Sequence, residues 1–114
     1  HYAPKGELTI YEGPQEAVVA AINAEITKRL SQGAVVGVLA TDETVGNYVS
    51  GNVYSIGSRN DEESIAAHLY RTLREFDEIG ADYIYSESFD DNPLSSAIMN
   101  RLRKAAGYRI VTIL

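Results

Sequence analysis

Short apolar runs alternate along this chain with longer segments whose apolar residues recur every three or four positions. The short runs are typical of strands and the periodic segments of helices with one buried face. The strand-like runs are Glu7–Tyr11, Val35–Leu39, Val53–Ile56, Asp82–Tyr85 and Arg109–Leu114. The helix-like segments lie between Pro14 and Gly33, Asn60 and Gly80, and Asn92 and Gly107. This alternation predicts βαβ units, and therefore an α/β fold: a Rossmann-like three-layer α/β/α sandwich with a mostly parallel sheet of about five strands.

The apolar positions of the helical segments predict the core. Residues expected to face the sheet are Val18, Ile22, Ile26, Leu30, Ile65, Leu69, Leu73, Phe76, Ile98, Leu102 and Ala105. Asn60 is expected to cap the second helix, with Glu63 completing a capping box. The continuous apolar run Val35–Leu39 is typical of a central strand covered on both faces.

The half-Rossmann plan places the strands in the order 3-2-1-4-5. Ligands of such sheets bind at the carboxyl ends of the strands, where neighbouring strands send their connections to opposite faces. In this order that point lies between the first and fourth strands. The candidate ligand cleft is formed by Gly13, Gly57, Ser58, Ser86 and Ser88.

Composition limits the class of protein. The 114 residues, 45% of them apolar, suit one domain with a single core. We assign it to residues 7–114 and the end of an interdomain linker to residues 1–6. The absence of cysteine excludes a disulfide framework and a thiolate zinc site, and is compatible with a cytoplasmic location. No apolar run approaches the roughly 20 residues that span a bilayer, so no membrane partner is expected.

The formal net charge of −6 disfavours direct binding of nucleic acid by the domain as a whole. Arg101, Arg103 and Lys104 form the densest basic stretch that could oppose this average. A dinucleotide fingerprint is not supported, because the turn Tyr11–Glu16 holds one glycine and two carboxylates. A phospho-acceptor receiver site also fails, since Gly57 stands where such a site needs an aspartate.

No catalytic set of residues and no metal site is expected in this chain. Glu87, Asp90 and Asp91 offer oxygen ligands for a hard cation, but their spacing matches no calcium loop, and a solvated loop is favoured. His68 lies beside the apolar stripe of its helix, with no second internal histidine.

Two polar pairs on helices are candidates for an interdomain contact. Arg74 and Asp77 are one turn apart and are expected to pair locally, as a surface ion pair worth at most about 1 kcal/mol. Asn100 and Arg101 leave the flank of the last helix, and surface exposure and a partner contact remain open alternatives for them.

The first five residues, His1-Tyr2-Ala3-Pro4-Lys5, are too polar and extended for a core element. Pro4 donates no backbone hydrogen bond and biases Ala3 towards an extended conformation. The segment is therefore expected to be a stiff tether, and a domain that follows a tether is expected to have a neighbour upstream.

This tether, Gly57-Ser58 before an acidic helix start, Leu73-Arg74 with Asp77, and Ala97–Ala106 (AIMNRLRKAA) together resemble one family. It is the C-terminal domain of the long-form threonylcarbamoyl-AMP synthases of the YrdC/YciO/Sua family. The resemblance covers essentially the whole chain. Pro93-Leu94-Ser95 departs from the Gly-Leu-Gly of that family, which implies a stiffer helix start.

The resemblance implies an accessory or regulatory domain in tRNA threonylcarbamoyladenosine modification. The parent enzymes make threonylcarbamoyl-AMP and pyrophosphate from threonine, bicarbonate and ATP with Mg²⁺, in an N-terminal YrdC-like domain that is the expected partner. His1, Tyr2, Ala3, Pro4 and Lys5 would form a lid over that active site, and this domain itself would hold no cofactor. The alternatives are a small-ligand sensor, for example of a nucleotide, and an interaction module for other tRNA-modification proteins.

Overall fold

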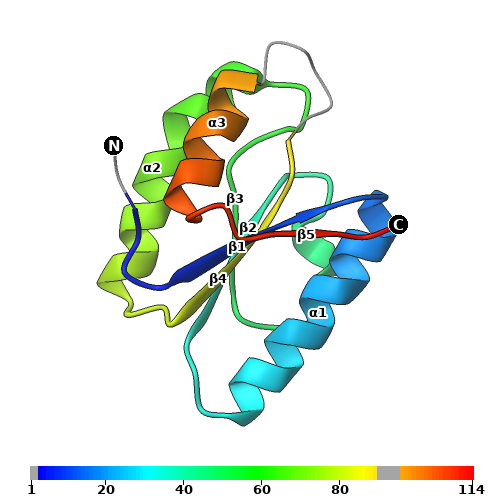
Figure 1. The fold of residues 1–114 in the computed structure, drawn as a ribbon, viewed down its shortest axis with the longest axis vertical. Coiled ribbons are helices and arrows are strands. Elements are labelled where there is room, and N and C mark those ends of the chain that lie inside the picture. The colour runs from blue at the N-terminus through cyan, green and yellow to red at the C-terminus, as the bar shows by residue number, and fades with distance from the viewer. Residues whose placement is uncertain (1–2, 90–95) are drawn as a thin grey trace.

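The computed structural model describes residues 3–89 and 96–114 (Figure 1). Its elements are β1 (Glu7–Glu12), α1 (Gln15–Ser31), β2 (Val36–Ala40), the short 3₁₀ helix η1 (Val45–Asn47), β3 (Asn52–Ser55), α2 (Glu62–Glu78), β4 (Tyr83–Glu87), α3 (Ser96–Ala105) and β5 (Ile110–Thr112). The strand pairs are parallel. Helix α1 covers one face of the sheet, and α2 and α3 cover the other (Figure 1). The predicted three-layer fold is confirmed.

The strand order is β3-β2-β4-β1-β5, so the predicted order 3-2-1-4-5 is wrong. The expected pairing of the first and fourth strands is present, with Leu8 opposite Ile84. However, β4 also pairs with β2, because the α1 connection skips one strand position and β4 fills it. In that position β4 finds backbone hydrogen-bond partners on both sides. Apolar patterns identify strands, but they do not specify which strands become neighbours.

The direction of each connection explains the distribution of helices. The step from β1 to β2 runs across the sheet in one direction, and the steps from β3 to β4 and from β4 to β5 run in the other. Crossover connections between parallel strands are right-handed, so two connections that run across the sheet in opposite directions lie on opposite faces. The β2–β3 connection lies against α1, where the Asn23 amide donates to the Asn47 carbonyl over 3.1 Å and accepts from the Val49 N–H over 2.9 Å.

The helical core residues are predicted correctly, with one exception. The predicted residues of α2 and α3 are buried, as are Val18, Ile22 and Ile26 of α1. Leu30 is 38% exposed. Helix α1 has 17 residues and is about 25 Å long, whereas a five-residue strand spans about 17 Å. The last turn of α1 therefore extends past the sheet and leaves Leu30 only partly covered.

Each strand differs from its predicted bounds by at least one residue, and the carboxyl ends of β4 and β5 differ by two. Strand β4 continues two residues beyond Tyr85, because Ser86 and Glu87 are buried inside the sheet despite their polarity. Strand β5 is shorter than expected and pairs only with β1. The predicted start of α3 at Asn92-Pro93 lies outside the described residues, as do His1, Tyr2, Asp90, Asp91 and Pro93-Leu94-Ser95. Across residues 3–89 and 96–114 we find no helix with the length and apolar character that crossing a bilayer requires.

Helix α2 is capped by Asp61 and not, as predicted, by Asn60. The Asp61 carboxylate accepts a hydrogen bond from the Ser64 N–H over 3.1 Å, because a turn that bonds the Asp61 N–H to the Ser58 carbonyl delays the helix by one residue. We expect Asp61→Ala to lower the free energy of unfolding by about 1 kcal/mol. Urea denaturation measures this. The neighbouring Asn60→Ala should change it by less than about 0.5 kcal/mol, and equal effects would contradict the assignment.

Candidate functional site

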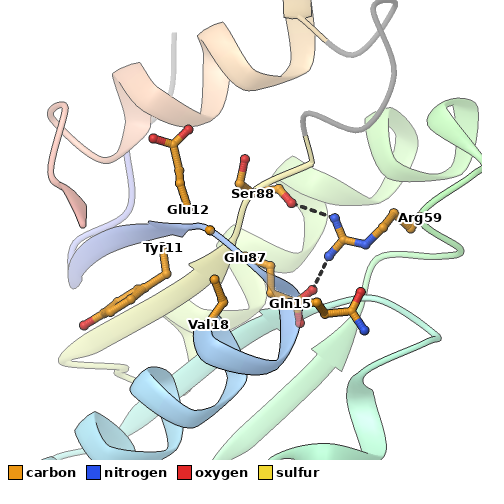
Figure 2. Close-up of a pocket in the computed structure, with 8 residues that line it drawn as sticks. Tyr11, Glu12, Gln15, Val18, Arg59, Glu87 and Ser88 are labelled. Atoms are coloured by element: carbon orange, nitrogen blue, oxygen red, sulfur yellow. Dashed lines mark hydrogen bonds and ion pairs between the residues drawn. The ribbon is translucent and has the colours of Figure 1, made fainter. Parts of the chain in front are cut away.

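A pocket of about 300 Å³ lies at the carboxyl ends of β1 and β4 (Figure 2). These neighbouring strands lead to helices on opposite faces, so the topology opens a crevice between them. The pocket is lined by Tyr11, Glu12, Gly13, Gln15, Val18, Arg59, Glu87 and Ser88.

Gly13 forms the turn between β1 and α1. Its φ of +145° lies in a region that side chains rarely adopt, and a Cβ atom there would lie 2.5 Å from the Ile113 carbonyl oxygen. The glycine is therefore required by the turn and by the close passage of the chain after β5. Pro14 follows at the N-cap position of α1, where it provides no side-chain hydrogen bond.

Arg59 is held at the pocket by the loop that follows β3. The Glu43 carboxylate accepts hydrogen bonds from the Arg59 N–H over 2.9 Å and from the Ser58 hydroxyl over 2.8 Å. These bonds hold the pKa of Glu43 below its usual value. The Arg59 side chain then crosses to β4, where it donates to the Ser88 carbonyl over 2.8 Å and to the Glu87 carboxylate over 2.5 Å (Figure 2).

Glu87 is the most buried charge of the site, with 1% of its surface exposed. One carboxylate oxygen pairs with Arg59, and the other accepts from the Thr44 and Tyr48 hydroxyls over 2.5 Å each. A buried carboxylate needs such partners, because burial of an unpaired charge costs several kcal/mol. The network joins the segments that follow β2, β3 and β4 into one rigid wall.

The Tyr48 hydroxyl is part of this wall, and its pKa is raised well above the ordinary value. Burial is the main cause, followed by the charge of Glu87 and the hydrogen bond to it. Unfolded Tyr48 ionises near pH 10 while the folded protein keeps the proton, so the free energy of unfolding should fall as the pH rises above about 10. Urea titrations at increasing pH should show this fall. In Tyr48→Phe the free energy of unfolding should fall less steeply with pH, by the slope that corresponds to about one proton. An unchanged slope would contradict the assignment.

The opposite wall carries a more exposed ion pair. Glu12, at the end of β1, lies 3.3 Å from Arg103 of α3, with about a quarter of each side chain exposed. Beside it, Tyr11 packs edge-on against Tyr85 with ring centroids 6.0 Å apart. Burial, with the charge of Glu25 as a second cause, raises the pKa of Tyr11 to about 12. This wall is therefore neutral overall and largely covered.

The predicted cleft residues are only partly brought together. Gly13 and Ser88 line the pocket, whereas Gly57 and Ser58 lie in the adjoining loop that holds Arg59. Ser86 is buried, and its hydroxyl donates to the Glu87 carbonyl over 2.7 Å. Sequence reasoning missed Arg59, although it directly follows Gly57-Ser58.

Of the acidic cluster Glu87, Asp90 and Asp91, Glu87 is the member that lies within the described residues. Glu87, which we expected in a solvated loop, is buried and pairs with Arg59. Within residues 3–89 and 96–114 no group of three or more His, Asp or Glu side chains is placed to hold a metal ion. The His68 ring nitrogen Nδ1 lies 2.6 Å from the carbonyl oxygen of Ser64 in its own helix.

The described end of the tether is attached to α2. The Lys5 N–H donates to the Asp77 carboxylate over 2.9 Å, which joins two of the predicted functional segments. Pro4 is half-buried and Ala3 is exposed. Arg74, Asn100 and Arg101 are exposed on α2 and α3.

Comparison with known proteins places this chain in a family. Residues 1–107 match the model of the threonylcarbamoyl-AMP synthase C-terminal domain. The chain belongs to this family. It is 46% identical over 111 residues to the threonylcarbamoyl-AMP synthase of Bacillus subtilis (strain 168), which covers 97% of this chain and 31% of that protein.

Solved structures of Sua5 proteins share the fold. Sua5 from Pyrococcus abyssi in complex with L-threonine matches with a TM-score of 0.87 and 38% identity, over 100% of this chain and 32% of that one. The C-terminal Sua5 domain of a hypothetical Sua5 protein from Pyrococcus horikoshii matches with a TM-score of 0.76 and 32% identity, over 97% of this chain and 100% of that one. The chain spans about a third of the length of the curated relatives it matches.

Proposed function

We propose that this chain is the accessory C-terminal domain of a threonylcarbamoyl-AMP synthase, and that it holds the tether His1–Lys5 over the active site of an N-terminal YrdC-like domain. The observation that carries the proposal is the family match, which begins at His1 and so includes the tether. The hydrogen bond from Lys5 to Asp77 supports it, because this bond fixes the base of the tether to the folded body.

The described residues suggest how such a lid would work. The Lys5–Asp77 bond anchors one end, and Pro4 restricts the backbone that leads away from it. A lid of this kind excludes water and protects a labile intermediate. Threonine, bicarbonate and ATP with Mg²⁺ would bind to the N-terminal domain, and this chain would supply no reacting group.

A domain exchange tests the proposal. The matched region of the Bacillus subtilis relative is replaced by this chain, and pyrophosphate release that depends on threonine and bicarbonate is measured. We expect the chimera to be active and the 114-residue chain alone to be inactive. His1→Ala/Tyr2→Ala in the chimera should lower kcat/KM by about tenfold or more, because the lid loses its side chains.

The hydrogen bond between Lys5 and Asp77 can be tested with a variant of Asp77 and a matched control variant at Glu78. Asp77→Ala in the chimera should lower kcat/KM by about threefold to tenfold, since the base of the lid becomes free to move. Glu78→Ala changes the charge equally at the next residue of α2, which is exposed, and should leave kcat/KM within about twofold. Turnover by the isolated chain, or full activity of the chimera without the His and Tyr side chains, would overturn the proposal.

A further inference from the structure

The chain enters β1 along the connection between α2 and β4 (Figure 1). The Lys5 N–H donates to the Asp77 carboxylate over 2.9 Å, and two residues later the Glu7 N–H donates to the Asp82 carbonyl over 2.9 Å. A single bond would leave the chain free to turn about it. Two bonds, one on each side of Gly6, fix both the position and the direction of the chain.

Gly6 makes this close passage possible. A Cβ atom at Gly6 would lie 2.3 Å from the Ala81 carbonyl oxygen and 3.2 Å from the carbonyl carbons of Ala81 and Asp82. These neighbours are backbone atoms, which do not move aside as the end of a flexible side chain does. The φ of Gly6 is not positive, so the glycine is required by the contact and not by the backbone conformation.

The α2–β4 connection is itself fixed to the sheet and to the core. The Asp82 carboxylate accepts from the Val35 N–H over 2.8 Å, and the Asp82 N–H donates to the Val35 carbonyl over 2.8 Å. The Ala81 N–H donates over 2.9 Å to the carbonyl of Phe76, which is fully buried. The chain before β1 therefore packs on a part of the molecule that cannot shift without disturbing the start of β2 and the core.

We propose that Gly6 is a positioning residue: it lets the α2–β4 connection hold the chain at two points, and this contact sets the direction in which the tether leaves the domain. The consequence for synthesis rests on the proposed lid, because Gly6 acts through the tether and not on a substrate. Misplacement of a positioned group by about 1 Å can cost about 100-fold in rate. A larger residue at position 6 should therefore misdirect the tether and leave the folded body in place.

Amide hydrogen exchange of the 114-residue chain tests the contact itself. Gly6→Ala should speed exchange of the Lys5 and Glu7 N–H groups by about tenfold or more, because both lose their acceptors. The Ile10 N–H donates to the Arg109 carbonyl over 3.0 Å further along β1, and its exchange rate should stay within about twofold. Unchanged exchange at Lys5 and Glu7, or equal acceleration at Ile10, would overturn the proposal.

Asp77→Ala is a second variant of the same contact. It keeps Gly6 and removes only the acceptor of the Lys5 N–H. Exchange should therefore accelerate by about tenfold at Lys5 and stay within about twofold at Glu7. Equal acceleration at the two residues would mean one flexible attachment and would overturn the two-point contact.

The chimera tests the consequence for activity. Gly6→Ala should lower kcat/KM by about tenfold or more, and by more than Asp77→Ala, because it removes both points of contact. Gly46→Ala is the matched control, since a Cβ atom there meets nothing within 4 Å, and it should leave kcat/KM within about twofold. Full activity of Gly6→Ala would overturn the positioning role. Failure of the lid itself is measured separately, as full activity of the His1→Ala/Tyr2→Ala chimera.

Discussion

Glu87→Gln is expected to lower the free energy of unfolding by about 3–5 kcal/mol. The substitution keeps the size of the side chain but removes the charge that Arg59 faces, and only 15% of the Arg59 side chain is exposed. The hydroxyls of Thr44 and Tyr48 also lose a charged acceptor. Breaking one half of a buried pair costs more than removing the whole pair, because the remaining charge stays buried. Urea denaturation of the 114-residue chain measures the change.

The ion pair between Glu7 and Arg109 provides the control. Its atoms are 4.0 Å apart, and about half of each side chain is exposed. Glu7→Gln should therefore cost less than about 1 kcal/mol. Arg59→Met combined with Glu87→Gln should be less destabilising than the sum of the two single variants, since neither charge is then left alone. If Glu87→Gln costs no more than Glu7→Gln, the buried network does not stabilise the protein.

The role of Glu87 illustrates what the sequence could not predict. Its partners Arg59 and Thr44 are 28 and 43 residues away along the chain, so no local pattern connects them. A carboxylate that follows Tyr85-Ser86 is typical of a strand end open to solvent. The insertion of β4 between β1 and β2 places this carboxylate beside the loops that carry Thr44, Tyr48 and Arg59. The predicted strand order was wrong for the same reason, because the choice of neighbouring strands depends on contacts between segments that are distant in sequence.

The local features were predictable because they depend on neighbours in sequence. The buried stripe of α2 follows from the spacing of Ile65, Leu69, Leu73 and Phe76, and each of these residues is buried. The position of Gly13 in the pocket follows from its place directly after β1. The predicted N-cap of α2 was wrong by one residue. Asn60 and Asp61 are both good capping residues, and a turn at Ser58 decides between them.

Lys5 and the pocket lie at opposite ends of β1. Lys5 precedes β1, and Glu12 ends it. The six residues of β1 span about 20 Å. A ligand in the pocket therefore cannot touch the Lys5–Asp77 anchor directly. Variants of the pocket and variants of the anchor can be read as independent tests, provided that both leave the folded body intact.

That folded body depends on the contact between Phe76 and Gly37. Phe76 is fully buried on α2 and stacks on Tyr54 with ring centroids 5.1 Å apart. Its ring fills the space left by Gly37 of β2, where a Cβ atom would lie 2.6 Å from the ring. Phe76→Ala should lower the free energy of unfolding by about 3–5 kcal/mol, because it leaves a cavity that the rigid sheet cannot close. Urea denaturation again measures the change.

The opposite change at the same contact tests the geometry. Gly37→Ala should cost about 1–3 kcal/mol, because the added methyl group forces the Phe76 ring to move. Gly46→Ala is the matched control, since a Cβ atom at Gly46 meets nothing within 4 Å, and its effect should stay below about 0.5 kcal/mol. Phe76→Leu shortens the side chain, so the double variant with Gly37→Ala should be more stable than additivity predicts. Strict additivity would mean that the two residues do not share this space, and the packing of α2 on β2 would then need another explanation.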